Sequence, residues 1–392
     1  MRSAMSRIPK PVQPNAERFA ISRRSAVEPF HAMDVLAAAN AMVQAGEDVV
    51  SLAVGQPSAP APLAVREAAA RATEAGRLGY TDALGRADLR RAIAGHYGEA
   101  YGLAIDPGRI AVTTGSSAGF ALAFLSLFDP GDRVAIERPG YPAYRNIMRT
   151  LGLVPVEFER IDGKAIEREG DTLAGVLVAS PGNPTGTVIG QQRMAGIAAA
   201  CEARSLPLIS DEIYHRLTYG DAADMTALAV APDAIVINSF SKFYCMTGWR
   251  VGWMVLPEAL VRPVERIAQS LYISAPEASQ IGAARAFDDP SELIAVRDGY
   301  ARNRDVLLEA LPRFGFSMAA RPDGAFYAWT DVSALTDDAM AFAKWMLAEA
   351  KVAAPPGHDF DPPLGHARMR FSYAGSHESI LRAVERLERW LA

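Results

Sequence analysis

Between residues 110 and 256, short apolar runs alternate with segments that have the periodicity of helices. The apolar runs are five or six residues long, and runs of this length without polar alternation are typical of strands buried on both faces. Strands that alternate with helices predict a mainly parallel sheet covered by helices on both sides, with ligands at the carboxyl ends of the strands. The expected strands are 110–114, 133–137, 153–158, 174–179, 206–210, 234–238 and 251–256, and the expected intervening helices are 117–128, 141–151 and 191–204.

The rest of the chain lacks this regular alternation of strands and helices, which predicts a second, smaller unit. With 392 residues, the chain exceeds the roughly 250–300 residues that one hydrophobic core usually serves. Helices are expected at 33–45, 62–75, 86–101, 291–311 and 337–350, extended segments at 49–54, 324–330 and 367–372, and an amphipathic helix at the C-terminus. We therefore expect an N-terminal arm and part of a small domain at 1–60, a large domain at 61–290 and a small C-terminal domain at 291–392.

Composition and charge argue against several classes of function. The chain has 40 basic and 45 acidic side chains and a net charge of −5, whereas a non-specific nucleic-acid binder needs a basic surface. Two cysteines, Cys201 and Cys245, are too few for a disulfide framework or a four-thiolate zinc site, and the six histidines show no ligand spacing, so no metal is expected. No apolar stretch suits a signal peptide or a membrane span. We expect a cytoplasmic protein without nucleic-acid or membrane partners.

One lysine lies where a nucleophilic amine could form. Lys242 follows the apolar run 234–238, lies among hydroxyl and aromatic residues, and has Arg250 eight positions later. An apolar setting removes water from an amine, which lowers its pKa and makes the neutral, nucleophilic form accessible. A lysine that forms a Schiff base needs this property, although most lysines in loops are solvated charges.

Residues 239–252, SFSKFYCMTGWRVG, resemble the lysine segment of the class I/II aminotransferases. These are pyridoxal-phosphate-dependent enzymes of fold type I, in the aspartate aminotransferase superfamily. Further motifs of the family follow in its order from Gly55 to Arg370. The resemblance implies an α/β fold, with the mainly parallel sheet in the large domain and a smaller α+β domain built from both chain ends. It also implies transamination between an amino acid and a 2-oxo acid, through a Schiff base of pyridoxal 5′-phosphate (PLP) on Lys242, whose freed amine moves the proton.

Two more motifs of the family imply side chains around the cofactor ring. Residues 179–186, ASPGNPTG, match its N-P-[TS]-G loop, which implies that the Asn183 amide donates to the phenolic oxygen of PLP. Residues 210–214, SDEIY, match its D-E-x-Y motif, which implies that Asp211 keeps the ring nitrogen protonated and that Tyr214 bonds the phenolic oxygen. Asp211 and Tyr214 therefore join Lys242 as expected catalytic residues.

The phosphate of the cofactor is expected to bind at the start of a helix. Residues 113–118, TTGSSA, run from a strand into a helix, so that backbone N–H groups face an anion and small side chains allow its close approach. The resemblance implies that the expected phosphate ligands here are Gly115, Ser116 and Ser117, with a hydroxyl from Ser239 and the guanidinium of Arg250.

The remaining expected site residues also rest on the resemblance. Tyr141, in the segment ERPGYP, matches the aromatic residue that stacks on the ring, and Tyr80 matches a tyrosine that reaches the phosphate across a dimer interface. A homodimer with shared active sites is therefore implied. Arg370 matches the residue that holds the substrate carboxylate, and Gly55 matches a loop that closes over the substrate. Asn183 is expected to contact the substrate as well as the cofactor. Strand alternation puts Arg368 on the same face as Arg370, so only the family pattern chooses between them.

Two alternatives remain open at this point. A C–S β-lyase, or other PLP chemistry on the same fold, would share the same motifs. A transcription regulator with an aminotransferase-like domain would need a separate DNA-binding domain, but only 54 residues precede the GQPSAP loop. The substrate is not determined by the motifs. Tyr244, 272–274, His358 and Phe360 are guesses for pocket positions, and no second arginine for a dicarboxylic side chain is evident.

Overall fold

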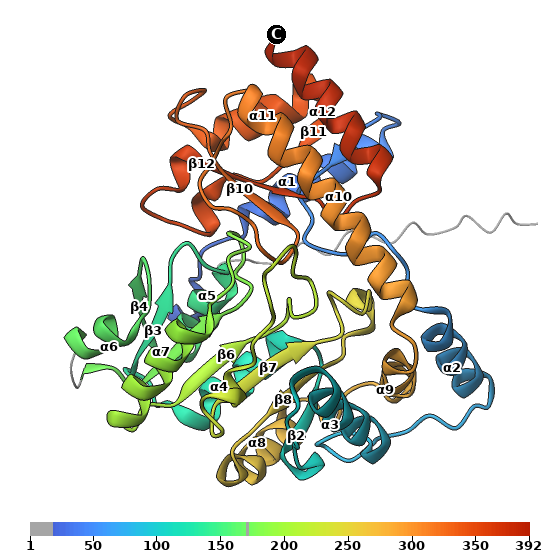
Figure 1. Ribbon diagram of the computed structural model, residues 1–392, viewed down its shortest axis with the longest axis vertical. Coiled ribbons are helices and arrows are strands. Elements are labelled where there is room, and N and C mark those ends of the chain that lie inside the picture. Colours follow the sequence, from blue (N-terminus) through green and yellow to red (C-terminus); the bar gives the residue numbers. More distant parts are fainter. Residues whose placement is uncertain (1–18, 170–171) are drawn as a thin grey trace, which may run out of the picture.

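The computed structural model describes residues 19–169 and 172–392, and Figure 1 shows a large sheet with its helices below a smaller unit. Residues 1–18 of the expected N-terminal arm lie outside the described ranges. Residues 19–30 of the arm contain one 3₁₀ turn, Arg23–Ser25. The described arm leads into α1 (His31–Gln44).

Seven strands form the large sheet in the order β2-β8-β7-β6-β5-β3-β4. All neighbouring strands are parallel except β8, which is antiparallel to both β2 and β7. The chain returns from β7 to β8 through a loop without an α-helix, and a return of this kind reverses the strand direction. Lys242 lies in this loop. The strands are β2 (Ile110–Thr113), β3 (Arg133–Glu137), β4 (Val154–Phe158), β5 (Gly175–Ala179), β6 (Leu208–Asp211), β7 (Ile235–Ser239) and β8 (Gly252–Val255).

Both faces of this sheet are buried, which confirms the predicted α/β fold with its helix-covered, mainly parallel sheet. Within β7, Val236 packs into one apolar core, whereas Ile235 and Ile237 pack into the other. The second core includes residues of α4 (Ser116–Leu127), α5 (Pro142–Leu151) and α8 (Glu258–Leu271). The first includes residues of α2 (Leu63–Glu74), α3 (Ala87–Tyr101), α6 (Gly163–Glu169), α7 (Gln191–Ala203) and α9 (Glu277–Ala284).

The smaller unit joins the two ends of the chain. β1 (Val50–Ser51) pairs in parallel with β11 (Val352–Ala353), and β10 (Tyr327–Asp331) pairs antiparallel with β9 (Ser317–Met318) and β12 (Arg368–Ser372). The long α10 (Ser291–Arg313) leads from the large-sheet helices up to this unit, which also holds α11 (Ala339–Ala350) and α12 (His377–Leu391) (Figure 1). These pairings support our proposal that 1–60 and 291–392 belong to a small domain and 61–290 to a large one.

The expected strand boundaries of the large sheet agree with the structure to within two residues. The sequence patterns missed α6, α8 and α9 entirely. The strand expected at 49–54 is also shorter than predicted, because its partner β11 offers only Val352 and Ala353 for pairing. Within the described ranges, no helix has the length and apolar character needed to cross a membrane.

Candidate active site

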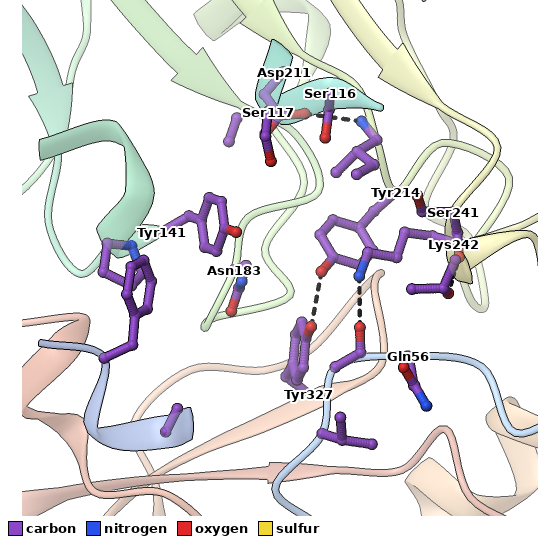
Figure 2. Close-up of a pocket in the computed structure, with 18 of the residues that line it drawn as sticks. Gln56, Ser116, Ser117, Tyr141, Asn183, Asp211, Tyr214, Ser241, Lys242 and Tyr327 are labelled. Carbon is purple, nitrogen blue, oxygen red and sulfur yellow. Dashed lines mark hydrogen bonds between the residues drawn. The ribbon is translucent and has the colours of Figure 1, made fainter. Parts of the chain in front are cut away.

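A cavity of about 440 Å³ lies at the carboxyl ends of β5, β6 and β7, where residues of the smaller unit face the large sheet. This is the edge of a parallel sheet at which ligands are expected. Figure 2 shows side chains from both units pointing into this space. Ten of the thirteen site residues expected from the sequence line the cavity: Gly55, Ser116, Ser117, Tyr141, Asn183, Asp211, Tyr214, Lys242, Arg250 and Arg370.

The Lys242 amine is held by one hydrogen bond in an electropositive setting. Its Nζ atom donates to the backbone oxygen of Gly55 at 2.5 Å (Figure 2). Burial is the main cause that lowers the pKa of this amine to about 8; the Arg370 guanidinium lowers it further, and the Asp211 carboxylate opposes the shift. A substantial neutral fraction near pH 8 agrees with the desolvated lysine expected from the sequence.

Gly55 brings the backbone close to the lysine because it has no side chain. A Cβ atom at this position would lie 2.1 Å from the hydroxyl oxygen of Tyr327. The same Tyr327 hydroxyl is 2.8 Å from the hydroxyl of Tyr214 (Figure 2). Burial raises the pKa of Tyr214 well above its usual value, as does the neighbouring Tyr327, so the phenol stays protonated. Tyr214 can therefore donate a hydrogen bond into the cavity or accept one from Tyr327.

Asp211 is the last residue of β6 and is buried. Tyr144 donates its hydroxyl to one carboxylate oxygen, and the Ile213 backbone N–H donates to the other at 3.0 Å. Burial raises the pKa of Asp211 to about 6, while the bonds from Tyr144 and Ile213 and the charge of Lys242 lower it. The two hydrogen bonds and the Lys242 charge do not offset the cost of burying this negative charge, so Asp211 favours a cationic partner inside the cavity.

Tyr144 is a site residue that the sequence interpretation missed. It lies one helical turn after Tyr141 in α5, so both rings project from the start of this helix, with centroids 5.4 Å apart. Tyr141, Tyr144 and Asp211 all line the cavity. The three-residue spacing of the two tyrosines was the signal that could have identified Tyr144.

The far end of the cavity is suited to an anion. The first residues of α4, Ser116 and Ser117, line it, and no side chain caps this helix, so backbone N–H groups remain free for a ligand. Gly115 precedes them with φ +84°, and a Cβ there would lie 2.5 Å from an Arg250 guanidinium nitrogen. Arg250 is exposed and donates to the backbone oxygens of Thr247 at 3.0 Å and Thr114 at 3.4 Å, which leaves its remaining N–H groups for a phosphate.

Arg370 faces the opposite side of the cavity and is rigidly held. Its guanidinium lies between the rings of Tyr327 and Phe360, with centroid distances of 4.2 and 4.6 Å. It donates to the Asn183 side-chain oxygen at 3.0 Å and to the Ala53 backbone oxygen at 2.9 Å, while its buried Nε atom has no partner. Because Arg370 occupies the Asn183 oxygen, the amide nitrogen of Asn183 is left to donate elsewhere.

Arg368 behaves differently from Arg370, although both lie on β12. It forms an ion pair with Asp331 on the neighbouring strand β10 and does not line the cavity. Arg370 therefore has the geometry of an anion-binding residue and Arg368 does not. Strand alternation alone could not distinguish the two, because it puts both on the same face of β12.

Three expected site residues do not line the cavity. Gly115 lies next to the guanidinium of Arg250. Ser239 is buried, and its hydroxyl lies 2.9 Å from the Ser241 hydroxyl and 3.1 Å from the Val251 backbone oxygen. Ser241, to which the sequence interpretation gave no role, lines the cavity in place of Ser239. Tyr80, the third of these residues, lies outside the cavity and is 83% exposed. Of the guessed pocket positions, Phe360 lines the cavity, whereas Tyr244, 272–274 and His358 are not among its lining residues.

The donors present fit PLP. The α4 N-terminus with Arg250 suits its phosphate, buried Asp211 suits a protonated ring nitrogen, and Lys242 offers an amine in the same cavity. The glycine at 115 is required for the close packing of Arg250 against the loop before α4. No side chain within the described ranges neutralises Asp211 by an ion pair, which leaves that role to a ligand cation.

Comparison with known proteins gives a consistent set of relatives. The family model described as aminotransferase class I and II matches residues 47–387. The valine–pyruvate aminotransferase of Mycobacterium tuberculosis is 45% identical over 95% of this chain and 98% of its own length. The aspartate/prephenate aminotransferase of Thermus thermophilus is 32% identical over 95% and 98%.

Solved structures show the same likeness. The structure of an aminotransferase from Mycobacterium tuberculosis has a TM-score of 0.92 and 44% identity, covering 95% of this chain and 99% of that one. The aspartate aminotransferase of Thermotoga maritima has a TM-score of 0.86 and 32% identity, covering 95% and 100%.

Proposed function

The chain is a member of the class I and II aminotransferases, and we propose that it transfers the amino group of a neutral, apolar amino acid to pyruvate or a similar 2-oxo acid. Transamination with PLP follows from its membership and from relatives named valine–pyruvate and aspartate aminotransferases. The donor class and the roles of individual residues are our proposal. Its main support is the apolar wall of the cavity described below.

When bound, PLP supplies an aldehyde that captures a primary amine and a ring that withdraws electrons from the captured carbon atom. In our proposal Lys242 holds the cofactor and, once freed, moves the substrate proton, which its lowered pKa supports. Asp211 holds the ring nitrogen in its protonated form, and Tyr214 with Asn183 donates to the phenolic oxygen. Ser116, Ser117 and Arg250 hold the phosphate, and Tyr141 covers the ring.

We propose that Arg370 binds the substrate carboxylate. Its planar guanidinium packs against the rings of Tyr327 and Phe360, and a planar guanidinium suits bidentate pairing with a carboxylate. The unpartnered Nε atom supports this role, because a buried guanidinium N–H without an acceptor favours an anionic ligand. With the amine near Lys242 and the carboxylate at Arg370, the substrate side chain turns toward the remaining wall of the cavity.

That remaining wall is apolar. It is formed by Phe30, Met33 and Leu36 at the start of α1, together with Ala32 and Phe360. Among the cavity-lining residues that the structure describes, the cationic groups are Lys242, Arg250 and Arg370, and each has a role already. A carboxylate on the substrate side chain would therefore be buried without a partner, which is costly.

A panel of amino donors with pyruvate as acceptor tests the proposed donor class. We expect kcat/KM for valine to exceed that for aspartate by roughly 10²–10⁴-fold, because an unpaired buried carboxylate costs about 3–5 kcal/mol. Met33→Arg, which adds a cation to the apolar wall, should narrow this ratio. Equal or better use of aspartate by the unaltered enzyme would contradict the proposal, and acceptor-independent release of ammonia and pyruvate from a sulfur amino acid would favour the β-lyase alternative.

We also propose a homodimer in which Tyr80 completes the active site of the partner subunit. Tyr80 lies in the connection between α2 and α3 and is 83% exposed. Its neighbour Thr81 is bound to Ser274 at 3.3 Å and to Gln280 at 3.0 Å, so the exposed ring projects from a backbone that is held in place. An exposed aromatic on a held backbone suits a contact outside this chain.

Mixed dimers of Lys242→Ala and Tyr80→Ala chains test this arrangement. Loss of a hydrogen bond to the phosphate should weaken PLP binding by roughly 10–100-fold in the Tyr80→Ala homodimer. If sites are shared, each mixed dimer contains one site with both Lys242 and Tyr80, and this site regains normal PLP affinity and activity. Mixed dimers purified through two different tags would be titrated with PLP. Affinity that stays as weak as in the Tyr80→Ala homodimer would contradict a shared site.

Finally, we propose that the protein works in the reducing cytoplasm. Cys201 and Cys245 are buried and unpaired. Burial raises the pKa of each thiol to about 12, so both stay protonated and inert at neutral pH. These properties suit packing residues in a reducing compartment.

A further inference from the structure

The first turn of α1 is held by a carboxylate from the other end of the chain. Asp359 accepts hydrogen bonds from the backbone N–H groups of His31 at 3.0 Å and Ala32 at 2.8 Å. The residue in the N-cap position, Phe30, makes no side-chain cap of its own. A carboxylate at this end also interacts favourably with the helix dipole. Asp359 is buried, so this cap is shielded from solvent.

The turn has one further contact with the same segment, because the His31 ring packs edge-on against His358 with centroids 6.3 Å apart. The buried residues of α1 are Val35 and Ala39, which pack with Ala53, Leu347 and Ala353 farther along the helix. The wall residues Phe30 and Met33 belong to the start of the helix, and Met33 is 59% exposed. The position of the apolar wall therefore depends strongly on the two hydrogen bonds to Asp359.

The turn that carries Asp359 is itself firmly mounted beside Arg370. A Cβ at Gly357 would lie 2.5 Å from the Cβ of Arg368, so this 3₁₀ turn (Gly357–Asp359) packs directly on β12. The Arg370 backbone N–H donates to the Pro355 oxygen at 3.1 Å, and Phe360 covers the Arg370 guanidinium. One short segment thus connects the proposed carboxylate anchor to the apolar wall.

The same segment is tied to the large domain next to Tyr141. The Gly140 N–H donates to the Phe360 oxygen at 3.0 Å, and Arg138 pairs with Asp361 at 3.3 Å. Arg145 donates to the backbone oxygen of Asp359. These contacts fix the backbone of the turn, so that its carboxylate can act as a stationary acceptor for α1.

We propose that Asp359 is a positioning residue for donor selectivity: by capping α1, it sets the distance of the wall formed by Phe30, Met33 and Leu36 from the substrate side chain. This inference rests on the proposed function, since it takes that wall as the side-chain pocket. Asp359 does not line the cavity, and so it acts only through the helix. Its loss lets the first turn of α1 fray and the wall recede.

Donor kinetics of the full-length holoenzyme test this inference. Asp359→Ala should lower kcat/KM for valine by about tenfold, mainly through KM, because the branched side chain loses its wall. For alanine, whose methyl group is too short to use the wall, the change should stay below about twofold. Asp359→Asn keeps one acceptor oxygen and should give an intermediate loss. Equal losses for alanine and valine, or no loss for either donor, would overturn the inference.

Ser376→Ala is the matched control. Ser376 caps α12 through the Ser379 N–H at 3.2 Å, in the same domain but in a helix without cavity-lining residues. Its removal should lower stability to a similar degree and leave the valine-to-alanine ratio unchanged. A change in this ratio as large as that for Asp359→Ala would show that general loosening of the small domain is sufficient, and would overturn the inference.

Hydrogen exchange separates this inference from the proposed donor class. In Asp359→Ala, amides of residues 31–35 should exchange at least about tenfold faster, whereas residues 39–44 should change little. If the unaltered enzyme prefers aspartate over valine, the proposed donor class fails, and the exchange result still decides whether Asp359 holds the first turn of α1. Unchanged exchange at 31–35 would overturn the inference whatever the donor preference.

Discussion

Lys242→Ala is expected to lower kcat by roughly 10⁴-fold or more, because it removes both the covalent attachment of the cofactor and the amine that moves the substrate proton. The fold should persist, because the Lys242 side chain lines the cavity and its removal only enlarges an existing space. The visible absorbance of the holoenzyme should change with the loss of the attachment. Steady-state kinetics, absorbance and thermal unfolding of the purified variant measure these three effects.

Lys164→Ala provides the control for this variant. Lys164 is an exposed lysine at the start of α6 and lies outside the cavity, so its loss should leave kcat within about twofold of the unaltered enzyme. If Lys242→Ala retained near-normal transamination, another group would have to move the proton. The assignment of Lys242 would then be wrong even though it lies in the cavity.

Asp211→Asn should give the second largest effect, a fall in kcat of roughly 10²–10⁴-fold. Asparagine keeps the shape of the side chain and one oxygen that can accept from either Tyr144 or Ile213, so the change removes the negative charge and one acceptor. Loss of one partner of a buried ion pair costs about 3–5 kcal/mol, which sets the expected range. The adjacent Glu212→Gln is the matched control: Glu212 accepts bonds from Thr226 and Ala227 and should affect stability rather than kcat.

The pH dependence of cofactor binding gives an independent test of Asp211. Burial raises the pKa of Asp211 to about 6, so in the cofactor-free protein the carboxyl becomes protonated as the pH falls through 6. Only the ionised form pairs with a ring cation. PLP affinity should therefore decline as the pH falls below about 6, and Asp211→Asn should bind more weakly with no step at this pH. An identical pH profile in both proteins would contradict the pairing.

The strands of the large sheet were predictable because they are buried on both faces. Runs such as 234–238 are apolar without interruption, and this pattern depends little on tertiary partners. The helices α8 and α9 were missed. Pro263 lies inside α8, and α9 has only eight residues, so neither has an uninterrupted long periodicity. The short β1 could not be delimited, since its length is set by β11, some 300 residues later.

Candidate site residues were predictable where a local motif carries them, as for Lys242, Asn183 and Asp211. Tyr144 could have been identified from its spacing to Tyr141, whereas Tyr327 and Ser241 were missed because their place in the cavity depends on how distant elements pack. The apolar wall of α1 could likewise not be predicted from the sequence, because nothing near residue 31 indicates that Asp359 caps this helix. Conversely, Arg370 could be preferred to Arg368 on physical grounds only after the ion pair with Asp331 was known.

Borohydride reduction of the PLP-saturated enzyme, followed by tryptic mass spectrometry, tests the central claim most directly. A cofactor held by Lys242 becomes permanently attached there, and trypsin no longer cuts after the modified lysine. We therefore expect one labelled peptide spanning residues 217–250, with Lys164, Lys344 and Lys351 unmodified. Label on another lysine, or no label in a protein shown to be saturated with PLP, would contradict the account.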